Sequence, residues 1–265
     1  MRANYKLRRL FVMQSLSEDV RIAADRAQSH YLLHVLRMES GRELLVFNGR
    51  DGEWRARIEI PSRKAVTLVP VRRERPQPEA ADLVFCFAPI KAGRLDWLVE
   101  KAVEMGAGAI QPVITDFTQN ARLNSGKMES WIIEAATQCG VLAVPELRPV
   151  VRLDSLLEGW PEDRALIFCD EDRGTDNPAP ALSAVRHDHL GVLIGPEGGF
   201  SDDERERLRA LPFVTAIPLG PRILRADTAA VAALTAVQML LGDWQHQGRG
   251  AASLSRSEDP PPGAP

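Results

Sequence analysis

The chain reads Leu193-Ile194-Gly195-Pro196-Glu197-Gly198-Gly199-Phe200 and, further along, Leu219-Gly220-Pro221-Arg222-Ile223-Leu224-Arg225-Ala226-Asp227-Thr228. Each stretch follows a short apolar run and leads into a segment with helical periodicity. Strands that alternate with helices form a parallel sheet, and ligands bind at the edge where the carboxyl ends of such strands lie. The two stretches therefore predict a single shared site built from two loops.

The same alternation of strand and helix extends back to residue 83 and predicts an α/β unit. Its apolar runs are short, and its helical segments have apolar residues at the spacing of one buried face. The expected strands are 83–87, 109–113, 165–169, 190–194 and 214–218, and the expected helices are 91–105, 127–139, 202–210 and 227–242. This order predicts a mostly parallel sheet covered by helices.

The first 74 residues have a different pattern. A helical segment at 23–38 precedes three β-rich runs at 43–47, 53–60 and 64–73, which predicts a small antiparallel sheet with one packed helix. Two prolines mark 75–82 as a linker. We therefore expect an N-terminal domain at 1–74, an α/β domain at 83–244 and a disordered tail at 245–265, which is rich in Ser, Gly and Pro.

Composition narrows the classes of protein that fit. The chain has 265 residues, of which 45% are hydrophobic and 26% charged, and it has no apolar run of the ~18 residues that a membrane span needs. No secretory signal pattern follows its basic start, so we expect a cytoplasmic protein without a membrane partner. Cys86, Cys139 and Cys169 are too few and too scattered for a disulfide framework, and His30 and His34 lack a third ligand, so no metal is expected.

Charge is divided unevenly along the chain. Residues 1–75 have a net charge of +7, whereas the remaining residues have −10. A basic domain joined to an acidic one indicates a partner rich in phosphate, because phosphate neutralisation supplies most sequence-independent affinity for nucleic acid. The alternative is an ordinary arginine-rich surface in contact with solvent.

The chemistry of the two loops favours a ligand that lies on the main chain. Gly195, Gly198 and Gly199 can adopt positive φ and admit a flat heterocycle, and the spacing matches neither a P-loop nor a dinucleotide fingerprint. Ser201 and Glu204 have the spacing of a capping box, which is a structural role.

Three charged residues of the loops are candidates for chemistry. Glu197 precedes the cap and has no helical role there, and Arg225 can stabilise an anionic oxygen. Asp227 and Thr228 can alternatively cap the final helix.

Five segments together resemble one family. They are Leu193–Phe200 with Glu204, the run Leu219-Gly220-x-Arg222-Ile223-Leu224-Arg225-x-Asp227-Thr228-Ala229, Glu100-Lys101-Ala102-x-Glu104-Met105-Gly106, Arg8-Arg9-Leu10-Phe11-Val12, and His34-Val35-Leu36-Arg37 with Gly41. The pattern resembles RsmE, the SPOUT-class family that methylates uridine N3 in the 16S RNA of the small ribosomal subunit. Two departures are Val141, where an arginine is usual, and Asp227, where a glutamate is usual.

The resemblance implies a fold and a cofactor. It implies a PUA-like β-barrel followed by a SPOUT domain, whose mostly parallel sheet has helices on both faces and a trefoil knot, and it implies a homodimer. It also implies S-adenosylmethionine held by two loops. The residues implied are Ile194, Gly195, Pro196, Glu197, Gly198, Gly199, Leu219, Gly220, Ile223, Leu224 and Thr228.

The resemblance also implies roles in the reaction. Arg225 is expected to stabilise the charge that develops on uracil, and Glu197 or Asp227 is a candidate general base. Arg8, Arg9 and Arg37 are expected to contact RNA phosphates. Two alternatives stay open: a SPOUT methyltransferase for another RNA position, such as a ribose 2′-hydroxyl or a tRNA base, and a non-catalytic RNA-binding or ribosome-assembly protein.

Overall fold

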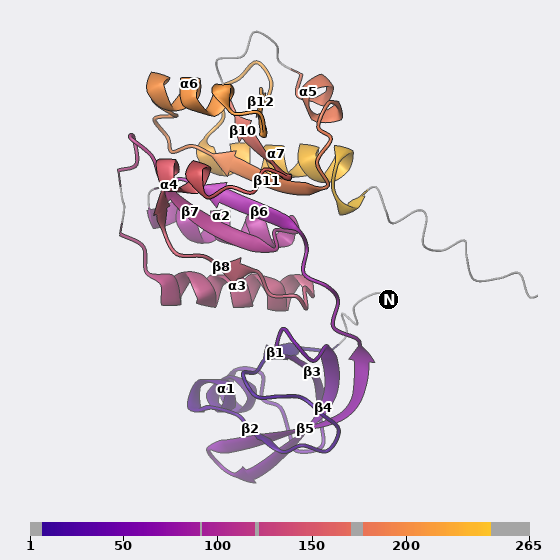
Figure 1. The fold of residues 1–265 in the computed structure, drawn as a ribbon. Coiled ribbons are helices and arrows are strands. Elements are labelled where there is room, and N and C mark those ends of the chain that lie inside the picture. The colour runs from indigo at the N-terminus through magenta and orange to yellow at the C-terminus, as the bar shows by residue number, and fades with distance from the viewer. Residues whose placement is uncertain (1–6, 91, 120–121, 171–176, 245–265) are drawn as a thin grey trace, which may run out of the picture.

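The computed structural model describes residues 7–90, 92–119, 122–170 and 177–244, which form a smaller N-terminal unit and a larger α/β unit (Figure 1). Strand β5 ends at Arg75 and β6 begins at Leu83, and residues 76–82 between them have no regular structure. This connection lies where the sequence predicts the linker. The tail predicted at 245–265 lies outside the described residues.

The N-terminal unit is a five-stranded sheet with one short helix. The strand order is β1-β3-β4-β5-β2, with β1 parallel to β3 and the other pairs antiparallel. Its apolar core includes Leu44, Val46, Ile58 and Leu68, all fully buried. The strands are β1 (Arg9–Phe11), β2 (Ile22–Ala23), β3 (Glu43–Phe47), β4 (Glu53–Ser62) and β5 (Ala65–Arg75).

The helix of this unit is shorter than the predicted 23–38. A capping box between Asp25 and Gln28 starts α1 (Arg26–His30), and a π-helical turn, η1 (Tyr31–Val35), follows it. Arg37 then has a φ of 51°, which a continuing right-handed helix does not permit. Local capping and this left-handed residue therefore set the two ends.

The α/β unit contains a parallel sheet with the order β12-β10-β11-β6-β7-β8. A further strand, β9, pairs in parallel with the end of β7. The strands are β6 (Leu83–Phe87), β7 (Ala109–Ile114), β8 (Glu146–Leu147), β9 (Val151–Arg152), β10 (Arg164–Cys169), β11 (His189–Ile194) and β12 (Val214–Ile217). The helices are α2 (Ala92–Glu104), α3 (Ser125–Cys139), α4 (Leu153–Glu158), α5 (Ala179–Ser183), α6 (Asp202–Ala210) and α7 (Ala226–Leu240).

Helices cover both faces of this sheet, as predicted. Phe85 and Phe87 of β6 belong to a core shared with α2, α3 and α7, whereas Val84 and Cys86 belong to a second core shared with α4 and α6. This division follows from the strand period of two, which sends successive side chains to opposite faces. The predicted strands and helices of this unit are all present, while β8, β9, α4 and α5 were not predicted.

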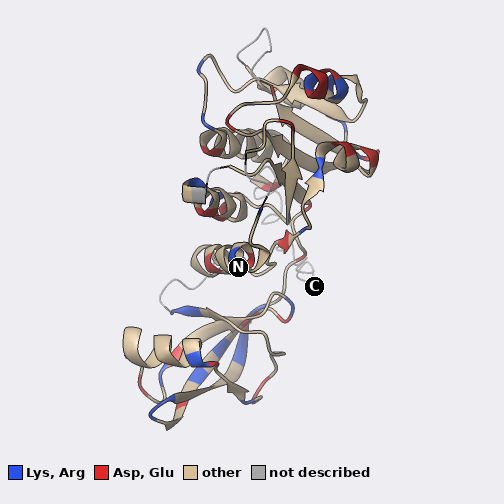
Figure 2. Cartoon of the chain, turned by 90° about the vertical axis from the view of Figure 1, so that its left-hand side faces the viewer, with Lys and Arg blue, Asp and Glu red and all other residues tan. Residues whose placement is uncertain are grey.

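Charged residues are arranged differently in the two units. Lys and Arg side chains are frequent along the strands of the N-terminal sheet, whereas acidic and basic residues are mixed on the helices of the α/β unit (Figure 2). Among the described helices, none combines the length and the apolar character that crossing a membrane requires.

Gly108, just before β7, is required by a close backbone contact. A Cβ at this position would lie 1.6 Å from the carbonyl oxygen of Ala81. We expect Gly108→Ala to lower the free energy of unfolding by about 3 kcal/mol, since the obstructing atom is backbone and cannot rotate away. Denaturant titration measures the effect.

Gly126 provides the matched control, because it lies in α3 and a Cβ there would have its nearest neighbour at 3.7 Å. Gly126→Ala should raise the free energy of unfolding by up to about 1 kcal/mol, through helix propensity. Equal effects of the two substitutions would contradict the contact at Gly108.

Candidate functional site

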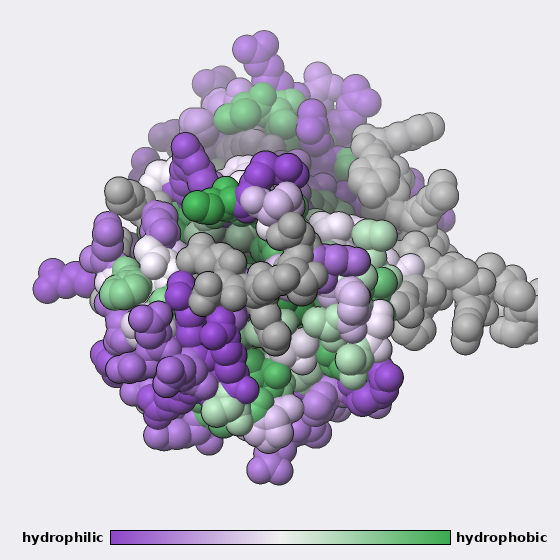
Figure 3. Space-filling view, turned by 90° about the horizontal axis from the view of Figure 1, so that it is seen from above, coloured by the Kyte–Doolittle hydropathy of each residue, from purple (hydrophilic) through white to green (hydrophobic). Residues whose placement is uncertain are grey.

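A cavity of about 380 Å³ lies at the carboxyl ends of β10, β11 and β12. It is lined by residues of the two glycine-containing loops predicted to meet, together with residues from the end of β10. This end of the molecule is mostly polar, with smaller groups of apolar residues between the polar ones (Figure 3). The loops meet because β10 pairs in parallel with both β11 and β12.

Most of the residues predicted for the cofactor and the reaction line the cavity. Among these, Gly198, Asp227 and Thr228 are the exceptions. Those that line it are Ile194, Gly195, Pro196, Glu197, Gly199, Leu219, Gly220, Ile223, Leu224 and Arg225.

The first loop is a tight turn in which only one of the three glycines needs a positive φ. The Gly199 N–H donates to the Pro196 carbonyl at 2.9 Å, and Gly199 has a φ of 70°. Gly195 and Gly198 instead allow close packing, since a Cβ would lie 2.9 Å from the ring of Phe200 at Gly195 and 3.2 Å from Phe117 at Gly198. The positive φ that these glycines can adopt is thus used at Gly199, and not at Gly195 or Gly198.

The predicted capping box, just after this loop in the sequence, holds the end of the loop in place. Glu204 accepts from the Ser201 N–H at 3.0 Å, and Ser201 Oγ accepts from the Glu204 N–H at 3.3 Å. The box also binds a third segment, because Glu204 accepts from the Asp116 N–H at 2.9 Å and Ser201 Oγ donates to the Asp116 carboxylate at 2.7 Å. The loop is therefore fixed by hydrogen bonds to two other segments.

Several side chains of the second loop are exposed. Gly220 has a φ of 88°, and Ile223 is 92% exposed. Arg225 is the N-cap residue of α7 and is exposed, and its side chain makes no capping hydrogen bond. Arg225 thus reaches the cavity from a helix terminus.

Asp227 is directed to a partner outside the cavity. Its carboxylate accepts from Arg94 Nη1 of α2 at 2.8 Å and from the N–H of Thr228 at 2.8 Å. The prediction that Asp227 or Thr228 caps α7 is wrong, since the cap position is Arg225 and Asp227 lies in the first turn. There its negative charge is favourable near the positive end of the helix dipole.

Sequence reasoning missed the residues that β10 contributes. Asp170 lines the cavity with a fully buried side chain, and its Oδ2 accepts from Arg209 Nε and Nη2 at 2.8 and 2.6 Å. Cys169 also lines the cavity, but burial raises the pKa of its thiol to about 12, which makes it a poor nucleophile. Ligands bind at the carboxyl ends of parallel strands, and this rule applies to the residue after β10 as well as to the two loops. Asp170 could therefore have been predicted at the cavity from the sequence.

The residues predicted to contact RNA divide into two groups. Arg8 and Arg37 are exposed on the N-terminal unit. The side chain of Arg9 is only 6% exposed, and its Nε donates to Glu53 at 2.7 Å. Arg9 is therefore not accessible to a phosphate in this structure, which corrects the sequence-based prediction.

Two family models match the chain, an RNA methyltransferase domain over residues 77–238 and an RNA methyltransferase PUA domain over residues 24–71. The chain belongs to the ribosomal RNA small subunit methyltransferase E family. A member of this family from Synechocystis is 30% identical, with 88% of this chain and 78% of the relative covered. A member from Rickettsia conorii is 28% identical, with coverage of 89% and 96%.

Solved structures agree with this family assignment. A methyltransferase of Legionella pneumophila in complex with S-adenosylmethionine is 30% identical, has a TM-score of 0.76 and matches 89% of this chain and 98% of its own. The methyltransferase E of Neisseria gonorrhoeae has a TM-score of 0.77 at 24% identity, covers 90% and 99% of the two chains and shows the same fold. The resemblance to the family in the sequence is thus confirmed.

The cavity suits the cofactor that the family implies. It has turns that expose backbone and apolar side chains such as Ile194 and Leu224. Within the described residues, no group of three or more His, Cys, Asp or Glu side chains is placed to hold a metal ion.

The capping box generates a prediction about the first loop. Glu204→Ala removes the acceptor of two backbone N–H groups, so we expect the free energy of unfolding to fall by about 2 kcal/mol. Glu206→Ala is the control, because Glu206 is an exposed carboxylate of the same helix. Thermal or denaturant unfolding checks both, and a loss no larger than that of the control would contradict the role of the box.

Proposed function

We propose that the chain transfers a methyl group from S-adenosylmethionine to ring N3 of a uridine in the 16S RNA of the small ribosomal subunit. The main support is the cavity, since the two loops that carry the family motifs form most of its wall. Membership of the methyltransferase E family supports the choice of RNA.

We assign cofactor binding to residues 194–199 and 219–224, and to Asp170 the role of holding Arg209 beside the cavity. The sulfonium of the cofactor supplies an electrophilic methyl group. The turn and the capping box restrict the first loop, which lowers the entropic cost of binding. Thr228, which is exposed outside the cavity, and Gly198, which packs on Phe117, support the site indirectly in this assignment.

The reaction at N3 requires that the ring lose its proton, after which negative charge spreads onto O2 and O4. Arg225 is placed to stabilise this charge, since its guanidinium can donate to an anionic oxygen from the cavity wall. Glu197 lines the cavity and is exposed, so we favour it over Asp227 as the general base. The ion pair with Arg94 gives Asp227 a structural role instead.

The N-terminal unit is proposed to hold the RNA. Its +7 charge and the match to a PUA domain model both support this role, and Arg8 and Arg37 are exposed for phosphate contacts. Phosphate contacts position the RNA without reading its sequence. The division into a PUA-like domain at 1–74, a linker at 75–82 and a SPOUT domain at 83–244 is part of the same proposal.

The knot and the dimer complete the proposal. We infer both from the resemblance to the SPOUT class, and the dimer is also supported by large exposed apolar side chains on two packed helices, Trp97 of α2 and Met239 of α7. Action on small ribosomal subunits would take place in the cytoplasm. Light scattering of the purified protein would test the dimer.

The test of the function uses small ribosomal subunits from a strain that lacks this protein. They are incubated with the protein and labelled S-adenosylmethionine, and the RNA is digested to nucleosides. We expect label in 3-methyluridine. Label in another nucleoside would assign a different RNA position, and cofactor binding without transfer to subunits or free RNA would favour a non-catalytic RNA-binding protein.

Arg225 provides a sharper test of the chemistry. Arg225→Ala should lower kcat by about 10²–10³, because it removes one donor to the developing anion, while the Kd for S-adenosylmethionine changes little. Arg186→Ala removes an exposed arginine of the same domain away from the cavity and should leave kcat unchanged. Equal kcat values for Arg225→Ala and the unmodified protein would refute the assignment.

A further inference from the structure

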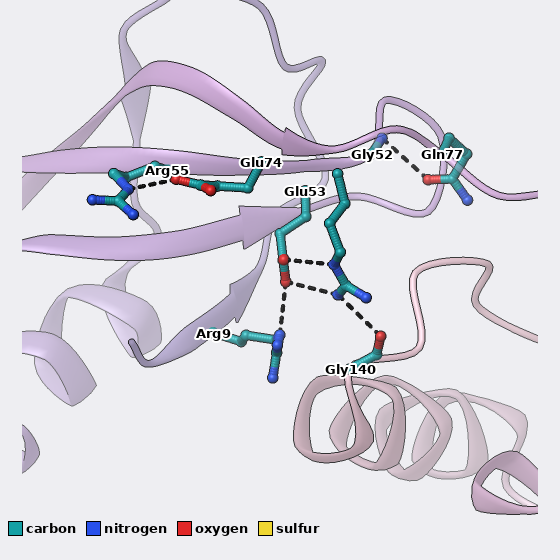
Figure 4. A network of polar contacts seen from close by, with 8 residues as sticks. Arg9, Gly52, Glu53, Arg55, Glu74, Gln77 and Gly140 are labelled. Carbon is teal, nitrogen blue, oxygen red and sulfur yellow. Dashed lines mark hydrogen bonds and ion pairs between the residues drawn. The ribbon is translucent and has the colours of Figure 1, made fainter. Parts of the chain in front are cut away.

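A buried carboxylate joins several segments where the two units of the chain meet (Figure 4). The side chain of Glu53, the first residue of β4, is 1% exposed. It accepts from Arg9 Nε at 2.7 Å, from Arg75 Nε at 2.8 Å and from Arg75 Nη2 at 3.0 Å. Two guanidinium groups from β1 and β5 are thereby fixed around one carboxylate.

Arg75 extends this network into the α/β unit. Its Nη2 also donates to the carbonyl of Gly140 at 3.1 Å, and Gly140 is the C-cap residue of α3, with a φ of 72°. The carbonyl end of a helix has a partial negative charge, so a guanidinium is favourable there. Because Glu53 holds the guanidinium in a bidentate geometry, the contact with α3 has a defined direction.

Apolar and backbone contacts surround the network. Phe47 of β3 is fully buried in the core of the α/β unit, and Phe11 packs edge-on against it with ring centroids 5.5 Å apart. A Cβ at Gly52 would lie 2.3 Å from the carbonyl oxygen of Arg75. The turn at 48–52 therefore fits closely against the start of the linker, which leaves little freedom for rotation.

This joint lies far from the cavity. Helix α3 and β8 are next to the N-terminal unit, whereas β10 and β12 are at the other end of the sheet (Figure 1). Four strand spacings separate β8 from β10, a distance of about 19 Å. A rotation of about 10° at the joint would displace the cavity by about 3 Å relative to RNA held on the N-terminal unit, and displacements of about 1 Å already reduce catalysis.

We propose that Arg75, oriented by Glu53, is a positioning residue for methyl transfer. It fixes the N-terminal domain on the C-terminus of α3, so that bound RNA has one orientation relative to the cavity. This inference rests on the proposed function, since it requires that RNA bind to one unit and react in the other. Arg75 acts on the productive fraction of bound RNA, and not on the affinity for RNA or for S-adenosylmethionine.

The test compares two arginines of the same sheet. Arg75→Met removes the polar contact with the C-terminus of α3, and Arg55→Met removes an equal charge from a residue that pairs with Glu74 and Glu43 inside the N-terminal unit. In Arg75→Met we expect kcat with small ribosomal subunits to fall at least about tenfold, with KM for subunits and Kd for S-adenosylmethionine within about twofold. In Arg55→Met we expect kcat to be unchanged. Loss of a positive charge by itself would weaken RNA binding, so it would raise KM for subunits and would not lower kcat.

A cross-link distinguishes lost orientation from other damage. A Cβ at Gly49 would lie 3.7 Å from the Cβ of Val144, a separation that a disulfide requires. Gly49→Cys with Val144→Cys can therefore join the two units covalently beside the network, in a Cys139→Ser background that removes a half-buried thiol. Gly49 has a φ of 78°, so cysteine is strained there, and each variant is compared with the same cysteine pair. Oxidation should restore kcat of Arg75→Met to within about threefold of the same cysteine pair with Arg75 intact, and reduction should abolish the rescue.

Three results would overturn the proposal: an unchanged kcat in Arg75→Met, an equal fall in Arg55→Met, and a failure of the oxidised pair to restore kcat. Distances between spin labels on the two units give a readout that does not depend on activity. Their distribution should broaden in Arg75→Met and not in Arg55→Met. If the unmodified protein transfers no methyl group but the distances still broaden in Arg75→Met, the proposed function is wrong. The role of Arg75 in fixing the two units relative to each other is then supported all the same.

Discussion

The site depends on the parallel pairing of β10 with both β11 and β12. This pairing places Phe168 beside Leu193 and Cys169 beside Ile217, so that three strands end at one edge. The loops that follow β11 and β12 are separated by α6 in sequence, yet they face each other across one cavity. Without this register the glycines and Arg225 would not share a site.

Each loop is held by a charged contact from an element outside the cavity. Glu204 connects the first loop to the backbone of Asp116, and Asp227 connects the start of α7 to Arg94 of α2. These carboxylates hold the two loops in place, and Glu197 and Arg225, to which we assign the chemistry, line the cavity.

Periodicity and turn chemistry predicted the α/β unit well, because each long element has a clear apolar face. The parallel-sheet rule also predicted that the two loops would meet. Side-chain partners distant in sequence were not predictable: Arg9 looks like a surface cation until Glu53 is placed beside it, and Asp227 looks like a cap until Arg94 is known. Short elements such as α5 were missed because five residues give too little periodicity.

The proposed cofactor site lies between the two loops. Hydrogen exchange measured by mass spectrometry, with and without S-adenosylmethionine, shows where the cofactor binds. We expect slower exchange at the backbone amides of 194–199 and 219–225, with the N-terminal sheet unchanged. Slower exchange elsewhere, with both loops unaffected at a saturating concentration, would exclude this site.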